Sequence, residues 1–229
     1  MHIAVLNLCK PDEGLEHFGT ISSMIIKWLN PHLPEAELTE IHIATGAPLP
    51  AFADYDGYIL SGSEKGVYDE AEWMEPLRAM LLQLKEAQIP VFGICFGHQL
   101  MADTYGGKAE KSDKGFVVGP REFTADGQQY AARVMHQDQV TEKPPNAEIT
   151  ASAPYCPVAA LQYNFPACSV QFHPEYPHSF IAEATEKFDG NIMTAQEAID
   201  SRESLARYTV ADDLYGAETA AFFRKHIMT

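Results

Sequence analysis

The segment from Ile89 to Tyr105, IPVFGICFGHQLMADTY, constrains the fold more than any other part of the chain. Its apolar run ends at Ile94 and predicts a buried strand, and the residues after Gly97 follow a helical pattern. Between them stands Gly-x-Cys-x-Gly, which is typical of a nucleophile elbow, a sharp turn that lifts one side chain above the end of a parallel strand. Glycine suits both outer positions because such a turn leaves no room for a Cβ. The lifted residue is Cys95.

The first hundred residues alternate between strand and helix patterns. Strands are predicted at 2–8, 38–43 and 57–60, helices at 17–29 and 70–87, and a further helix follows the elbow strand at 97–105. Such alternation is typical of βαβ units. The fold class is therefore α/β, a doubly wound, mostly parallel sheet with flanking helices.

The hydrophobic pattern of the sequence changes between residues 107 and 172. Short alternating runs are separated there by Gly, Pro, Asn and Asp, which predicts a small antiparallel extension of the sheet. Helical patterns return after Glu175, with a capping box at Thr194 and a last helix capped by Asp212 or Asp213. We expect a single domain over 1–229, with about 190–229 as a helical appendage of it. The polar stretch 190–207 fits a solvated hairpin, with a lid or a partner surface as alternatives.

Composition excludes several classes of function. Hydrophobic residues make up 46% of the 229 residues and charged residues 21%, as in ordinary globular proteins. Sixteen basic and 32 acidic residues give a net charge of −16, which argues against a nucleic-acid partner. The four cysteines have no CxxC spacing, which argues against zinc and against a disulfide scaffold. No apolar run approaches the roughly 18 residues of a membrane span, and no signal peptide is evident, so we expect a cytoplasmic protein without a membrane partner.

A second segment supplies what a reactive thiol needs. Residues 169–175, SVQFHPE, read as a short strand that delivers His173 and then Glu175. A nucleophilic thiol needs a base, and the base needs an orienting acid. Residues two apart in an extended segment point to the same side, so Glu175 is placed to support the His173 ring. Together with Cys95, the pair predicts a nucleophile, base and acid.

These two motifs resemble those of a known family. The sequences GICFGHQ (93–99) and QFHPE (171–175) are similar to the signatures of class I glutamine amidotransferases, the Cys-His-Glu glutaminases, and the resemblance covers roughly residues 1–175 in motif order. It implies the flavodoxin-like glutaminase fold and catalysis by Cys95, His173 and Glu175, with no metal or organic cofactor.

The resemblance also implies further site residues. The backbone N–H groups of Ser63 and Phe96 correspond to the two donors of the oxyanion hole, although many relatives have Gly-Gly-Pro where this chain has Gly62-Ser63-Glu64. The substrate contacts carried over are Gly62, Gln99, His136, Gln137 and Asp138. Related glutaminases often have Ser-His-Gly-Asp in the last of these loops. The sequence here is closer to the His-x-Asp-x-Val form of stand-alone γ-glutamyl peptidases.

Three functions are open at this point. The first is a glutaminase that releases ammonia from glutamine through a Cys95 thioester and supplies it to a separate synthase, because the chain has no ATP-binding motif of its own. The second is a stand-alone γ-glutamyl hydrolase or peptidase that cuts larger γ-glutamyl amides. The third is a non-enzymatic redox sensor that uses Cys95 as an oxidisable thiol. The proton-transfer residues His173 and Glu175 argue against the third.

Overall fold

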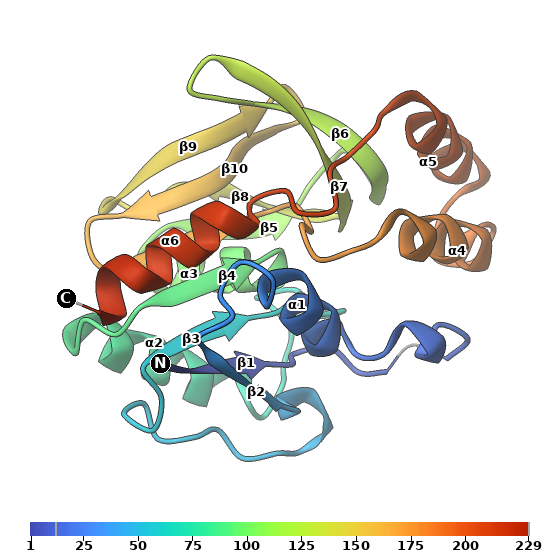
Figure 1. Cartoon of the computed structure of the whole chain (residues 1–229). Helices are drawn as coiled ribbons and strands as arrows, with labels where there is room; N and C mark the ends of the chain where they lie inside the picture. The colour runs from blue at the N-terminus through green and yellow to red at the C-terminus, as the bar shows by residue number, and fades with distance from the viewer. Residues whose placement is uncertain (12, 229) are drawn as a thin grey trace.

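A nine-stranded mixed sheet runs through the centre of the computed structural model, which describes residues 1–11 and 13–228 (Figure 1). The strand order is β2-β1-β3-β4-β11-β10-β9-β6-β7, and β5 and β8 form a separate two-stranded sheet. The strands are β1 (His2–Leu6), β2 (Glu37–Ile41), β3 (Gly57–Leu60), β4 (Val91–Ile94), β5 (Lys108–Lys111), β6 (Val117–Ala125), β7 (Gln128–His136), β8 (Asp138–Glu142), β9 (Ala147–Ala153), β10 (Cys156–Tyr163) and β11 (Ala167–Val170).

The sheet changes from parallel to antiparallel at β11. This strand pairs with β4 in parallel and with β10 in antiparallel orientation. The five strands from β2 to β11 are therefore parallel, and β10, β9, β6 and β7 form the antiparallel part. The expected α/β class is confirmed. The segment that ends at His173 differs from the expectation, because its strand belongs to the parallel core as well as to the antiparallel extension.

Helices cover both faces of the parallel part. The helices are α1 (Ile21–Leu29), α2 (Met74–Glu86), α3 (Phe96–Thr104), α4 (His178–Phe188), α5 (Ala195–Arg207) and α6 (Gly216–Ile227), with 3-10 turns at Glu16–Phe18 and Ile43–Thr45. Of these, α4 and α5 lie against β6 of the antiparallel part. Figure 1 shows α1 and α6 in front of the sheet and α2 and α3 behind it. Strand β1 shows why both layers are needed. Ile3 and Val5 pack in the cluster that contains α1 and α6, whereas Ala4 and Leu6 pack in the cluster that contains α2 and α3.

Two predicted elements differ from the structure, and one observed element was not predicted. The helix expected over 17–29 is split, because Gly19 has a φ of 86° and the α-helix starts only after its N-cap, Thr20. The last helix is not capped by Asp212 or Asp213; it follows Tyr215, whose φ is 65°, and Asp212 instead pairs with Arg133. The two-stranded sheet of β5 and β8 was not predicted.

The stretch 190–207 is not a solvated hairpin. Its helix α5 begins with the predicted capping box, in which the Thr194 hydroxyl accepts from the Glu197 N–H and the Glu197 carboxylate accepts from the Thr194 N–H. The helix packs against β6 so closely that a Cβ on Gly119 would lie 2.3 Å from the Ser204 hydroxyl. The small side chains Ala198, Ser201 and Ser204 therefore form a narrow buried face on α5, and its charged residues lie outside that face.

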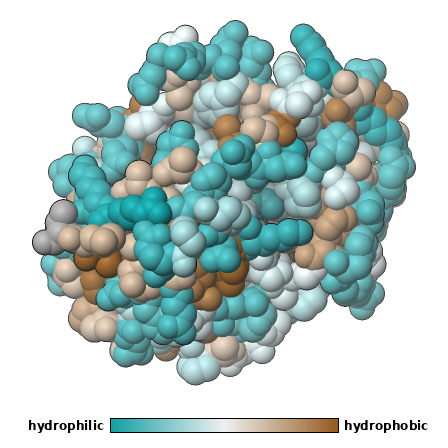
Figure 2. All heavy atoms as spheres, in the orientation of Figure 1, coloured by the Kyte–Doolittle hydropathy of each residue, from teal (hydrophilic) through white to brown (hydrophobic). Residues whose placement is uncertain are grey.

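Hydrophilic side chains cover most of the face seen in Figure 2, and hydrophobic atoms form small groups between them. None of the helices within residues 1–11 and 13–228 combines the length and the apolar composition needed to cross a bilayer.

Candidate active site

Cys95 sits at the turn between β4 and α3 in a conformation that is rare for its residue type. Its φ of 52° and ψ of −102° lie outside the common regions, and its N–H donates to the Val170 carbonyl oxygen at 2.8 Å. Strain of this kind persists only where the surroundings enforce it, and it concentrates at functional sites. The sharp strand-to-helix turn expected from the sequence is therefore present, with the thiol at its tip.

The two flanking glycines are required by packing. A Cβ on Gly93 would lie 2.5 Å from the Met101 sulfur and 2.8 Å from the backbone of Gly97. A Cβ on Gly97 would lie 2.7 Å from the Leu60 carbonyl oxygen on β3. The elbow thus fits against its neighbouring strand only because both positions lack a side chain.

His173 and Glu175 lie beside this turn at the end of β11. The His173 Nδ1 and the Glu175 Oε1 are 2.7 Å apart, and both residues are at least 95% buried. Gly62, which follows β3, lies between the ring and the thiol. A Cβ there would be 3.0 Å from His173 Cε1 and 3.8 Å from Cys95 Cβ. Two segments distant in sequence therefore bring the sulfur, the imidazole and the carboxylate to one place, with Gly62 of a third segment beside them.

The electrostatic surroundings favour a charged imidazole. Burial disfavours the protonated ring, but the Glu175 carboxylate and the Cys95 sulfur outweigh it, so the pKa of His173 is raised above its ordinary value. The sulfur itself lies 3.8 Å from the Met135 carbonyl oxygen and 3.6 Å from the Gln171 amide nitrogen. Of the two states of the ring, this arrangement favours the imidazolium.

Two backbone N–H groups border the thiol. Phe96 is the first residue of α3, where helical N–H groups have no partner within the helix. Ser63 follows Gly62 at the end of β3. Within the described chain, no acceptor is assigned to either N–H. The Phe96 ring points away into the core and packs edge-on against Trp73, with ring centroids 5.8 Å apart. Both N–H groups stay candidates for the oxyanion hole that the sequence predicts.

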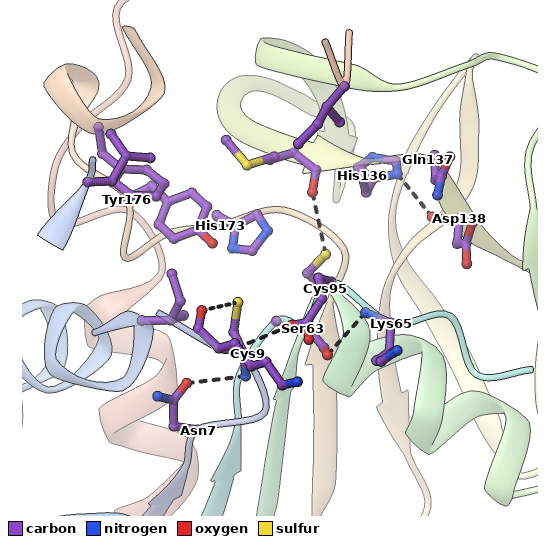
Figure 3. Close-up of a pocket in the computed structure, with 18 of the residues that line it drawn as sticks. Asn7, Cys9, Ser63, Lys65, Cys95, His136, Gln137, Asp138, His173 and Tyr176 are labelled. Atoms are coloured by element: carbon purple, nitrogen blue, oxygen red, sulfur yellow. Dashed lines mark hydrogen bonds between the residues drawn. The ribbon is translucent and has the colours of Figure 1, made fainter. Parts of the chain in front are cut away.

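A cavity of about 470 Å³ opens over the thiol (Figure 3). Eight of the ten predicted site residues line it: Gly62, Ser63, Cys95, Gln99, His136, Gln137, Asp138 and His173. The other two do not line the cavity. Glu175 contacts the far side of the His173 ring, and Phe96 is the first residue of α3. Figure 3 shows Lys65, Gln137 and Asp138 on one side of Cys95, and His173 and Tyr176 on the other.

A network of hydrogen bonds fixes the 136–138 loop. The Gln99 amide nitrogen donates to the Asp138 carbonyl oxygen at 2.8 Å and to the Gln171 side-chain oxygen at 3.1 Å. The His136 Nδ1 lies 3.0 Å from the same Asp138 carbonyl, which must accept, so Nδ1 bears the proton. Burial lowers the pKa of His136 to about 3, so its ring is neutral. Gln99 and His136 therefore position Asp138 in addition to facing the cavity.

Asp138 presents a carboxylate to the cavity. The Tyr68 hydroxyl donates to its Oδ1 at 3.2 Å. Burial raises the pKa of this carboxyl, although the bond from Tyr68 opposes the shift. A buried carboxylate with one neutral donor has capacity to accept a further donor, such as an ammonium group.

Sequence reasoning missed three residues of this site. Tyr176 stacks on His173 with ring centroids 4.0 Å apart and an angle of 7° between the planes. Gln171 contacts both the Cys95 sulfur and Gln99, and Lys65 lines the cavity from the loop after β3. The positions of Tyr176 directly after Glu175 and of Gln171 two residues before His173 were the available signals. Within residues 1–11 and 13–228, no group of three or more His, Cys, Asp or Glu side chains is arranged to hold a metal ion.

Comparison with known proteins identifies the family. The model of the class-I glutamine amidotransferase family matches residues 29–187. Gamma-glutamyl peptidase 3 of Arabidopsis thaliana is 30% identical over 165 residues, which are 66% of each chain. The GMP synthase (glutamine-hydrolyzing) of Bordetella avium is 36% identical over 145 residues, which are 56% of this chain and 26% of that one. The chain belongs to the class-I glutamine amidotransferase family.

The relatives' names are those of hydrolases and amidotransferases, which supports an enzymatic role. The aligned segment spans just under two thirds of the γ-glutamyl peptidase and about a quarter of the GMP synthase. The fold is also found in solved structures. A glutamine amidotransferase from Thermotoga maritima superposes with a TM-score of 0.76 at 15% identity, covering all of this chain and 98% of that one. One from Methylobacillus flagellatus gives a TM-score of 0.73 at 18% identity over 98% and 94% of the two chains. At these identities the likeness concerns the fold alone.

Proposed function

We propose that this protein hydrolyses the amide bond of γ-glutamyl amides through a thioester on Cys95. The observation that supports this most directly is the buried contact of 2.7 Å between His173 Nδ1 and Glu175 Oε1, next to a strained cysteine at the floor of a cavity. The three side chains match the roles of nucleophile, base and orienting acid.

In the first half of the reaction, His173 holds the proton of the Cys95 thiol, and the thiolate attacks the γ-carbonyl carbon. The carbonyl oxygen becomes an oxyanion that the N–H groups of Ser63 and Phe96 stabilise. The imidazolium then gives its proton to the amine nitrogen, the C–N bond breaks, and a glutamyl thioester remains on Cys95. The free Nε2 is the ring atom for this transfer, because Nδ1 is held by Glu175.

In the second half, water attacks the thioester carbonyl while His173 accepts a proton from it. The same two N–H groups stabilise the second oxyanion, the C–S bond breaks, and free glutamate leaves. The Asp138 carboxylate is suited to the substrate α-ammonium group, and Lys65 to its α-carboxylate. These two contacts account for specificity for a glutamyl group.

The size of the cavity favours an amide larger than glutamine. Its volume of about 470 Å³ is in the range of about 300–1,000 Å³ that sites for drug-sized ligands occupy. Direct hydrolysis of such amides is therefore our first proposal. The likeness to the glutaminase part of GMP synthases favours a second candidate, in which glutamine is hydrolysed and ammonia passes to a separate synthase.

The test is amine release from glutamine and from γ-glutamyl alkylamides, with mass spectrometry of the quenched enzyme to detect the thioester. We expect turnover and a glutamyl adduct on the peptide that contains Cys95, and neither in Cys95→Ala. Turnover that persists in Cys95→Ala would overturn the proposal. Activity only on glutamine and only with an added synthase would favour the second candidate.

A further inference from the structure

The cavity over Cys95 is divided into a charged part and an apolar part. Among the described residues that line it, Asp, Glu, Lys and Arg occur only after β1, in the loop after β3 and at the start of β8: Lys10, Glu64, Lys65 and Asp138. The Lys10 N–H donates to the Glu64 carboxylate at 3.3 Å, which ties the first two of these segments together. The charged part is thus the side that suits the α-ammonium and α-carboxylate of a glutamyl group.

The opposite part is built from hydrophobic side chains of the β1–α1 loop, β7 and α4 and of the segments before β6 and before α5. They are Leu15, Phe116, Met135, Phe180, Phe188 and Ile192. Leu15, Phe180 and Phe188 belong to one hydrophobic cluster, with Phe116 and Met135 packed against it. Tyr176 joins this wall to the catalytic histidine, since it stacks on His173 and lies 4.4 Å from the Phe180 ring, centroid to centroid. We call these six residues and Tyr176 the apolar wall.

The chemistry of the reaction sets which half of the substrate faces the apolar wall. The departing amine nitrogen must come within reach of His173, which protonates it. His173 and Tyr176 lie on one side of Cys95, and Lys65 and Asp138 lie on the other (Figure 3). A glutamyl group bound on the charged side therefore directs the amine and its substituent toward Tyr176 and the apolar wall.

We infer that the preferred substrates are γ-glutamyl amides whose amine bears an uncharged aliphatic or aromatic group. This inference rests on the proposed function and names the substrate class. An ammonium or carboxylate on the amine would lose its hydration against the apolar wall without a partner of opposite charge. A buried methylene there would instead raise kcat/KM about fourfold.

The experiment compares kcat/KM of the wild-type enzyme for glutamine, γ-glutamyl-ethylamide, γ-glutamyl-pentylamide and γ-glutamyl-4-aminobutylamide. The last two have substituents of nearly equal length and differ by a terminal methyl or ammonium group. We expect kcat/KM to rise from glutamine to the pentylamide, and the pentylamide to exceed the aminobutylamide at least tenfold. Equal or better turnover of the aminobutylamide, or a maximum at glutamine, would overturn the inference and leave the proposed function standing. Turnover of none of these amides would overturn both.

A variant tests whether the apolar wall is responsible. Ile192 is 57% exposed at the rim, so Ile192→Glu adds a carboxylate there, a partner for the ammonium of the aminobutylamide, without disturbing the core. We expect the ratio of kcat/KM for the pentylamide to that for the aminobutylamide to fall severalfold. Ile199→Glu is the matched control, because Ile199 is 45% exposed on α5 and does not line the cavity. Equal ratios in the two variants would count against the assignment.

Discussion

The side chain of Arg133 donates to the backbone carbonyl oxygen of Tyr176 at 3.0 Å, while its own carbonyl oxygen accepts from the His173 N–H at 2.7 Å. The same guanidinium donates to the Val210 carbonyl oxygen and to the Asp212 carboxylate at 2.9 and 2.8 Å. One buried residue on β7 therefore ties the His173–Tyr176 turn to the segment before α6.

Loss of this guanidinium is expected to cost more stability than loss of its charge partner. Arg133→Met leaves the buried carbonyl oxygen of Tyr176 and the partly buried one of Val210 without a donor, and each lost hydrogen bond to a charged group costs about 1.5–3 kcal/mol. Asp212→Asn removes only an exposed charge, because the Asp212 side chain is 82% accessible, and is expected to cost less than about 1 kcal/mol. Urea unfolding of both variants measures the difference. Equal losses would show that the ion pair, and not the carbonyl contacts, matters.

The Glu175 carboxylate is predicted to set the alkaline limit of activity. Burial opposes the charged ring, and Glu175 and Cys95 raise the pKa of His173 against it. The proposed mechanism needs the imidazolium to protonate the amine, so activity falls as pH rises through that pKa. Glu175→Gln is therefore expected to lower kcat/KM about 10²–10⁴-fold and to move the alkaline limb to lower pH. The pH profile of kcat/KM measures both effects.

The control for this prediction is Glu183→Gln, which removes an exposed carboxylate from α4. We expect that profile to overlay the wild-type profile. An alkaline limb that stays in place in Glu175→Gln would contradict the assigned role of the carboxylate, whatever the change in rate.

The sequence predicted those parts of the molecule in which a local pattern determines the structure. The elbow around Cys95 is set by two glycines and an apolar run, and the capping box of α5 by Thr194 and Glu197, so both were found within a few residues. The QFHPE segment also placed His173 and Glu175 on the same side. Local spacing is sufficient in these cases because the interacting groups are close in sequence.

The features that sequence analysis missed depend on contacts between distant segments. The β8 strand begins with Asp138 and Gln139, which look unlike a strand until pairing with β5 buries them. Asp212 has the residue type of an N-cap but binds Arg133 from 79 residues away. The apolar wall combines Leu15 with residues of α4, and no periodicity joins those segments. The single-domain boundary at 1–229 and the catalytic roles of the site residues stay predictions.

His98, beside the elbow, is predicted to make folding sensitive to acid. Its ring is fully buried between the Ser169 hydroxyl and the Val158 carbonyl oxygen, and burial lowers its pKa to about 4. The unfolded chain binds this proton near pH 6.5, whereas the folded protein resists it until about pH 4. The contribution of His98 to the free energy of unfolding is therefore complete above pH 6.5. It falls by roughly 1.4 kcal/mol per pH unit as the pH drops from 6.5 to about 4.

Urea unfolding at pH 7 and pH 5 compares wild type with His98→Gln, and the wild type is expected to lose more stability between the two values. The difference between the two proteins isolates His98 from the other titrating groups. His173 acts in the opposite direction, because its raised pKa favours the folded state as pH falls. Equal losses in the two proteins would mean that the folded protein accepts a proton on His98 without penalty.

Gly97→Ala is predicted to impair both folding and activity through one clash. The added Cβ would lie 2.7 Å from the Leu60 carbonyl oxygen. The Gly97 N–H donates to the Ser61 carbonyl oxygen at 3.2 Å, so the two backbone segments that clash are also tied to each other. Such overpacking costs about 1–3 kcal/mol. A backbone shift that relieves this clash moves Cys95 and the Phe96 N–H, and a shift of about 1 Å at a reacting group lowers the rate on the order of 100-fold.

Gly127→Ala, in the β6–β7 turn, is the control: its φ is 75° and its added Cβ meets nothing within 4 Å. We expect the control to lose about 1 kcal/mol from backbone strain alone and to keep wild-type kcat/KM. Wild-type activity in Gly97→Ala would mean that the position of the elbow against β3 does not govern catalysis.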